Sequence, residues 1–344
     1  MHGKQVIIWG RSISGLHLYI KLKKAGADII GFTDSYAIQD EIFMSRKVIC
    51  LDELYKYNAF IFVSTQDKNN LIDILELIEK IEIGNSKIVT QLSVWGPYKY
   101  DTEEMKSRHE KEAEKIREVF NKLYDQESKK VFQNLLKYQE TNRIELLRES
   151  YEMGHEQYFP TDFLHKCEDE VFIDAGAYDG STSLEFIDWI GGEYEHIYMM
   201  EPDIMMKRVC DEVVRLKNMK DVSVYGKGAY SERCILNFIS DFETGSSSIS
   251  NVGEMKIETI SIDEMLLGNR ATYIKMDIEG AEKQALIGCK KTIERYRPKL
   301  AICIYHEPSD LWEIPYYILS KYPFYKLYIR HYTDITTETV LYAE

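Results

Sequence analysis

Polar residues that can carry out acid–base chemistry stand where apolar runs end in the second half of the chain. They are Asp174, Glu201, Asp277, Glu279 and His306. A carboxylate or an imidazole can take the proton of a hydroxyl within hydrogen-bond reach, and a carboxylate can also bind the paired hydroxyls of a ribose. The carboxyl ends of parallel strands meet at one edge of a sheet. The pattern therefore predicts a ligand-binding edge that also carries acid–base groups.

The stretch VFIDAGAYDG, residues 171–180, has the residue order of a strand, a tight turn and the start of a helix. Its first three residues form a continuous apolar run of β-formers, as in a strand buried on both faces. Gly176 and Gly180 allow backbone conformations and close approaches that a side chain forbids. Ser181 can open a helix whose free N–H groups face the crevice. The glycine spacing differs from the G-x-G-x-x-G of dinucleotide-binding folds.

Three later stretches deliver polar residues to the same predicted edge. They are HIYMM (196–200) before Glu201 and Pro202, YIKMDIE (273–279) with Asp277 and Glu279, and LAICIYHE (300–307) with His306. Each stretch is an apolar strand pattern that runs into an acid or a histidine. An acid at the end of the second strand is suited to binding a ribose.

Four motifs in this half resemble those of the FkbM-type S-adenosylmethionine-dependent methyltransferases. They are DAGAYDG (174–180), Glu201-Pro202, IKMDIEGAE (274–282) and Tyr305-His306. The KMDIEGAE block is the most specific of them. The resemblance implies a class I methyltransferase fold, which is an α/β fold with a seven-stranded, mostly parallel, Rossmann-like sheet and one antiparallel strand near its edge. It also implies S-adenosylmethionine as methyl donor and S-adenosylhomocysteine as product.

The resemblance assigns a set of residues to the cofactor. They are Asp174, Gly176, Tyr178, Gly180, Ser181, Glu201, Pro202 and Ala229. Ala229 follows the third expected strand, where backbone groups meet the adenine in this fold. Tyr158 and Phe159 precede the first strand and are suited either to covering a purine or to packing on the sheet. Residues 244–248 (TGSSS) form a loop that the family places near the active site, although such a run is also typical of a plain flexible loop.

The catalytic prediction follows from the donor. The sulfonium already carries an activated methyl, so the protein must align a nucleophile and exclude water. His306 is the candidate base, with Asp277 and Glu279 orienting the acceptor or the amino group of the cofactor. Glu279 is also suited to capping the helix after Gly280, and His306 to a structural role at the strand end. A divalent metal held by these carboxylates and the histidine is a further alternative that the sequence leaves open; we predict none.

Residues 1–95 have the strand–helix alternation of a small Rossmann-like domain, with strands expected at 5–9, 29–33 and 59–64. The turn GRSISG (10–15) and Asp34 have the outline of a dinucleotide fingerprint, but Ser12 replaces the glycine that lets the backbone approach a pyrophosphate. Arg11 is suited to a phosphate or a sugar nucleotide. We favour a degenerate module that presents substrate or forms a homo-oligomer over an NAD site.

Residues 96–155 have the apolar spacing of helices, which we expect to link the first domain to a methyltransferase domain at 156–344. The formal charge of −14 over 344 residues argues against nucleic acid or an anionic membrane as partner. Without a signal-like segment or a long apolar run, we expect a cytoplasmic protein. Six scattered cysteines show no metal-ligand spacing and indicate reduced thiols.

These observations predict an enzyme that O-methylates a hydroxyl of a sugar, glycan or related natural product. N-methylation of an amino sugar or an amino-acid-bearing glycan is the nearest alternative, because a neutral amine carries its own lone pair. A non-catalytic sugar-nucleotide-binding or sensor protein is an alternative of another class. A nicotinamide oxidoreductase built on the first domain is disfavoured by Ser12.

Overall fold

The structure is a computed structural model that describes residues 2–344 except 12–14, 16–17, 20–21, 24, 39–40, 65–67, 85, 91–97, 153–156, 241–246 and 250–254. These residues form two compact units, one within residues 1–96 and the other within residues 97–344. No helix in the described ranges is long and apolar enough to cross a membrane.

The first unit is built on a four-stranded parallel sheet in the order β2-β1-β5-β6. Its strands are β1 (Gln5–Trp9), β2 (Asp28–Thr33), β5 (Phe60–Val63) and β6 (Lys87–Thr90). Successive side chains on a strand point to opposite faces, so Trp9 and Ile8 enter separate apolar clusters. The unit also contains β3 (Ile42–Phe43), β4 (Arg46–Lys47), the 3-10 helix η1 (Leu51–Lys56) and helix α2 (Lys68–Lys80).

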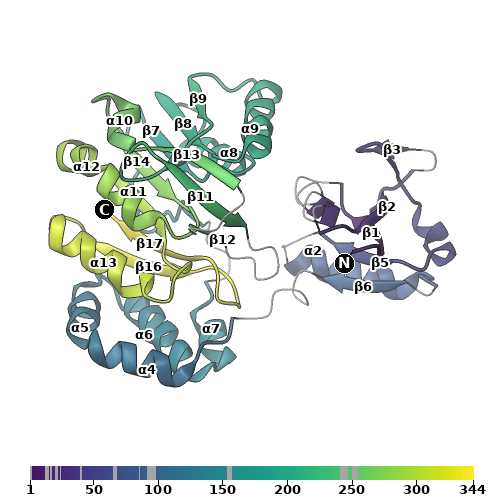
Figure 1. Ribbon diagram of the computed structural model, residues 1–344, viewed down its shortest axis with the longest axis horizontal. Coiled ribbons are helices and arrows are strands. Elements are labelled where there is room, and N and C mark those ends of the chain that lie inside the picture. Colours follow the sequence, from purple (N-terminus) through teal and green to yellow (C-terminus); the bar gives the residue numbers. More distant parts are fainter. Residues whose placement is uncertain are drawn as a thin grey trace. The chain divides into compact units, whose positions relative to one another are not determined.

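The second unit is built on a seven-stranded sheet in the order β16-β17-β15-β14-β7-β8-β9 (Figure 1). Its strands are β7 (Val171–Ala175), β8 (His196–Met200), β9 (Val222–Tyr225), β14 (Tyr273–Met276), β15 (Lys299–Cys303), β16 (Leu327–His331) and β17 (Thr339–Ala343). All neighbouring pairs are parallel except those that β17 makes. The carboxyl ends of β7, β8, β14 and β15 therefore lie at one edge.

Helices cover both faces of this sheet and explain why its central strands are apolar throughout. They are α8 (Ser181–Ile190), α9 (Ile204–Leu216), α10 (Ile262–Leu266), α11 (Glu282–Gly288), α12 (Lys290–Tyr296) and α13 (Asp310–Lys321). Ile274 and Ile302 belong to one apolar cluster, and Phe172 and Tyr273 to another. A smaller sheet in the order β10-β13-β11-β12 contains β10 (Gly228–Ala229), β11 (Ile235–Ser240), β12 (Ser247–Ile249) and β13 (Met255–Ile260).

The helices expected as a separate linker belong to the second unit instead. They are α4 (Thr102–Lys111), α5 (Ala113–Lys122), α6 (Gln126–Thr141) and α7 (Ile144–Ser150). Helix α5 packs against α13, and α6 packs against β16 (Figure 1). The buried Arg330 of β16 pairs with Asp125 at 2.7 Å. The predicted helical faces are thus buried within the second unit, which corrects the boundary at residue 155.

Candidate active site

The turn after β7 is fixed from beneath by a buried ion pair. Asp174 has no exposed surface, and it accepts a hydrogen bond from Ser183 Oγ at 2.8 Å. Lys275 Nζ of β14 lies 3.1 Å from Asp174 and donates to the carbonyl of Gly176 at 2.7 Å. Burial lowers the pKa of Lys275, but the charges of Asp174 and Asp277 raise it further, so the ammonium persists. Asp174 thus supports the turn from a buried position, and its assignment to the cofactor stays a prediction.

Two glycines of this turn adopt left-handed backbone conformations. Gly176 has φ +79° and Gly180 has φ +80°. A Cβ on Gly176 would lie 1.8 Å from the carbonyl oxygen of Asp277, whereas one on Gly180 would lie 3.6 Å from its nearest neighbour. Gly176 is therefore the point at which the turn after β7 meets the end of β14. The exposed Tyr178 lies between them, also at positive φ, +50°.

Glu201 connects the end of β8 to this turn. Its Oε2 accepts from the N–H of Tyr178 at 2.9 Å, and its Oε1 accepts from the N–H of Asp203 at 2.8 Å. Burial raises the pKa of Glu201 to about 7 although these N–H groups oppose the shift. Each carboxylate oxygen keeps a further lone pair for a ligand hydroxyl.

The remaining predicted cofactor residues surround the same turn. The N–H of Ser181 donates to Asp179 Oδ1 at 2.9 Å, which fixes the first turn of α8. Pro202 lies against Gly228, because a Cβ on that glycine would be 3.7 Å from Pro202 Cγ. The next residue, Ala229, is buried in β10. The segment 244–248 lies largely outside the described residues, which take up again at Ser247 in β12.

Asp277 is the centre of the polar cluster at the ends of β14 and β15. Tyr158 Oη donates to its Oδ2 at 3.0 Å, and Tyr305 Oη donates to its Oδ1 at 3.1 Å. The same oxygen lies 3.3 Å from His306 Nε2. Burial raises the pKa of Asp277, but the bond to His306, the charge of Lys275 and the bond to Tyr158 lower it by more, so the net pKa lies below the ordinary value. Asp277 is thus a carboxylate held by three ring groups.

His306 lies among three carboxylates. Its Nε2 is 3.6 Å from Glu279 Oε2, and its Nδ1 is 3.0 Å from Glu282 Oε1, while 8% of the side chain is exposed. Burial lowers the pKa of His306, but the neighbouring carboxylates of Glu282 and Asp277 raise it well above the ordinary value. The imidazole is therefore more basic than an ordinary histidine side chain. Its role as a base remains a prediction.

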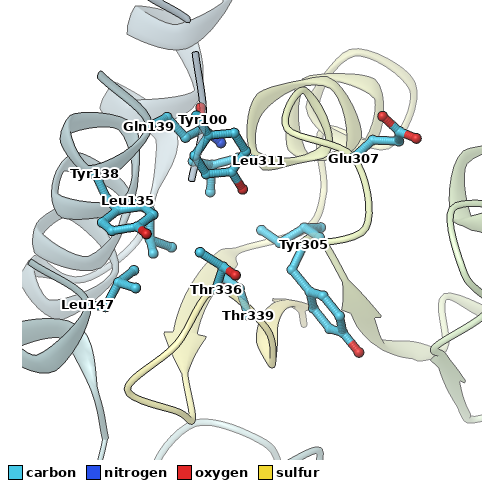
Figure 2. A pocket seen from close by; sticks show the side chains of 11 residues that line it. Tyr100, Leu135, Tyr138, Gln139, Leu147, Tyr305, Glu307, Leu311, Thr336 and Thr339 are labelled. Carbon is cyan, nitrogen blue, oxygen red and sulfur yellow. The ribbon is translucent and has the colours of Figure 1, made fainter. Parts of the chain in front are cut away.

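A small pocket opens beside this cluster (Figure 2). Side chains of α6 and α7 line one side, and residues that follow β15, one residue of α13 and residues before and at the start of β17 line the other. The lining residues are Tyr100, Leu135, Tyr138, Gln139, Leu147, Ile304, Tyr305, Glu307, Leu311, Thr336 and Thr339. Tyr305 lines this pocket and also donates a hydrogen bond to Asp277, so it belongs to both the pocket and the polar cluster.

Comparison with known proteins decides the class of the protein. Residues 174–333 match the family model described as the methyltransferase FkbM domain. The protein is a methyltransferase. The crystal structure of methyltransferase FkbM from Methylobacillus flagellatus KT is similar, with 22% identity and a TM-score of 0.62 over 100% of this chain and 90% of that chain. The chain therefore shares the fold of that structure.

Two solved structures with ligands match more distantly. Aeropyrum pernix fibrillarin with natively bound S-adenosyl-L-methionine has 14% identity and a TM-score of 0.35, over 52% of this chain and 67% of that chain. A putative methyltransferase from Streptococcus mutans in complex with SAH has 11% identity and a TM-score of 0.33, over 51% and 89%. The curated proteins contain no match to the sequence.

Glu282 is a member of the methyltransferase site that the sequence analysis did not single out. Its side chain is fully buried beneath His306, and its Oε1 accepts from the N–H of Ile278 at 2.8 Å. Capping of this helix was the alternative role considered for Glu279, but the N-cap of α11 is Ala281, with no side-chain cap hydrogen bond. Glu282 is the last residue of the KMDIEGAE block, so the motif itself could have indicated it. Its position at the start of a helix gave no sign that the acid is buried.

Tyr158 and Phe159 are not placed as a stacking surface for a purine. Tyr158 is buried and binds Asp277, while Phe159 packs in an aromatic cluster with Phe172 and Trp189. Of the two uses that the sequence left open, the structure favours packing on the sheet, with Tyr158 adding a hydroxyl to the site.

The nucleotide candidates of the first unit are bound to each other. Arg11 forms an ion pair with Asp34 and a second one with Glu41 at 2.5 Å. Ser12 lies outside the described residues. The two groups expected to contact a phosphate and a ribose therefore neutralise one another in this methyltransferase.

Proposed function

We propose that the protein transfers a methyl group from S-adenosylmethionine to a hydroxyl of a sugar, a glycan or a related natural product. The acceptor oxygen attacks the methyl carbon, the carbon–sulfur bond breaks, and its electron pair stays on the sulfur of S-adenosylhomocysteine. The hydroxyl proton passes to a base of the protein. The observation that carries the proposal is the cluster around Asp277, which lies against the Gly176 turn within an FkbM domain.

The cofactor is proposed to lie along the edge formed by the turn after β7 and the end of β8. Gly176, Tyr178, Gly180 and Ser181 would line the turn, Glu201 would bind the ribose, and Pro202 and Ala229 would flank the adenine. The positive φ angles and buried carboxylate described above support this arrangement, because they give an open backbone beside a hydrogen-bond acceptor.

Replacing Glu201 with alanine should weaken S-adenosylmethionine binding by about 1.5–3 kcal/mol, because charge-assisted hydrogen bonds to the ribose are lost. Calorimetric titration of the folded variant measures this change. Glu212→Ala is the matched control, since Glu212 is exposed on α9 and pairs with Arg215 at 2.5 Å. Unchanged affinity in the Glu201 variant would remove the ribose assignment.

Cofactor affinity should depend on pH through Glu201. With a pKa raised to about 7, the carboxyl is mostly ionised at pH 8 and mostly protonated at pH 6. A protonated carboxyl is the weaker acceptor for ribose hydroxyls, so the dissociation constant should rise about tenfold as pH falls from 8 to 6. Glu201→Gln should bind with a flatter pH profile. A profile shared by both proteins would contradict this assignment.

The reaction class is tested by titrating the full chain separately with S-adenosylmethionine, S-adenosylhomocysteine and NAD. We expect both adenosyl ligands to bind at micromolar concentration and NAD to give no signal, because Arg11 and Asp34 occupy each other. Binding of NAD alone would overturn the proposal and move the chemistry to the first unit.

A further inference from the structure

Three donor groups at the ends of β14 and β15 have the composition of a cation site. One ligand atom from each of Asp277, Glu282 and His306 lies within 4.8 Å of the other two. The His306 ring has Glu282 Oε1 3.0 Å from Nδ1 and Asp277 Oδ1 3.3 Å from Nε2. We propose that these three side chains bind a divalent cation.

Two buried atoms of the cluster point to a missing ligand independently of the acidic composition. Glu282 is fully buried, and its Oε2 has no hydrogen-bond partner among the described residues. His306 Nδ1 likewise makes no hydrogen bond within the described ranges, although it lies 3.0 Å from Glu282 Oε1. A buried carboxylate oxygen without a partner carries a desolvation cost that native proteins seldom leave uncompensated. Coordination of a cation would satisfy both side chains.

The charges around the cluster favour the same ligand. Asp277, Glu279 and Glu282 all lie within 3.6 Å of the His306 ring. The nearby cation Lys275 is paired with Asp174. Three carboxylates around one imidazole leave a negative excess even when the ring is protonated, and a divalent cation removes it.

The chemical types of the donor groups also limit which cation is favoured. Carboxylate oxygens suit Mg²⁺, Ca²⁺ and Mn²⁺, whereas imidazole suits Zn²⁺ and other transition metals, so a mixed set favours Mn²⁺ or Zn²⁺. The side chains of Asp277 and Glu279 are 25% and 41% exposed, so one side of the cluster is open to solvent and to an acceptor. The role of the cation rests on the proposed function: a bound ion lowers the pKa of an acceptor hydroxyl beside the methyl donor.

The test is a titration of the chelator-treated full chain with MnCl₂, followed by the electron paramagnetic resonance signal of free Mn²⁺, with ZnCl₂ measured by calorimetry. We expect one saturable site. Loss of a residue that merely supports a metal ligand typically costs 10–100-fold in affinity, so Asp277→Asn and Glu282→Gln should each weaken binding at least about tenfold. Glu294→Gln, an exposed acid 3.8 Å from Lys290, is the matched control and should bind as the parent does.

Circular dichroism establishes that each variant is folded; if the buried Glu282 variant is not folded, Asp277→Asn alone decides. Saturable binding that the control keeps and Asp277→Asn loses supports the site. No saturable Mn²⁺ or Zn²⁺ binding up to millimolar concentration, or equal affinity in all variants, overturns it. Binding of S-adenosylmethionine to the parent protein is measured alongside the metal titration. If the parent binds the cofactor but no metal, only this inference is refuted. If the parent does not bind the cofactor, the proposed function is refuted.

Discussion

Replacing Gly176 with alanine should lower the free energy of unfolding by about 3 kcal/mol and abolish S-adenosylmethionine binding. A side chain at φ +79° costs about 1–2 kcal/mol, and the new Cβ would lie 1.8 Å from the carbonyl oxygen of Asp277. Relief of such a clash requires a backbone shift, which typically costs a further 1–3 kcal/mol. The strand ends of β7 and β14 would separate, so the cofactor turn and the polar cluster would both lose their positions.

Urea unfolding of matched glycine variants separates these two costs. Gly191→Ala changes a residue with φ +87° at the end of α8, where an added Cβ has nothing within 4 Å, so it should lose only the conformational part. Gly180→Ala adds an ordinary contact at 3.6 Å and should lie between the two. If all three variants lose the same stability, the close approach at Gly176 is not the reason for its glycine.

The architecture of the site follows from features that the sequence displays locally. The run before Asp174 is apolar because β7 is covered on both faces, and the observed strand, Val171–Ala175, begins where the pattern predicts. Once β7, β8, β14 and β15 are parallel neighbours, the acids that end them must share an edge. For this reason the structure brings Asp277, Glu279 and His306 together as expected.

The remaining features depend on contacts between distant segments. Tyr158 reaches Asp277 across 119 residues of sequence from a backbone at φ +69°, which no local pattern indicates. Asp174 has the spacing of a cofactor ligand, but only the packing of β14 shows that Lys275 holds it from below. The helical segment after residue 97 has charged surfaces typical of a linker, and its place on β16 is visible only in the tertiary structure.

Replacing His306 with alanine should slow methyl transfer by roughly two to four orders of magnitude while leaving the dissociation constant of S-adenosylmethionine nearly unchanged. The ring is the group that joins Asp277, Glu279 and Glu282, so its removal leaves three carboxylates without their shared cation or ligand. The cofactor turn is held instead by the hydrogen bond from the Tyr178 N–H to Glu201 and by the bond from Lys275 to the Gly176 carbonyl. Neither bond involves His306, so binding of S-adenosylmethionine should survive.

The measurement is transfer of a labelled methyl group to a panel of sugar diols and amino sugars under single-turnover conditions. His165→Ala is the control, because that side chain is 83% exposed and pairs only with Glu344 among the described residues. Asparagine at position 306 separates two contributions, since its amide can still bridge carboxylates but cannot take a proton at neutral pH. If the asparagine variant keeps its activity, His306 acts by positioning the acids. If both variants lose activity equally, the result supports proton transfer or ligation by the ring. Full activity in the alanine variant would remove His306 from the mechanism.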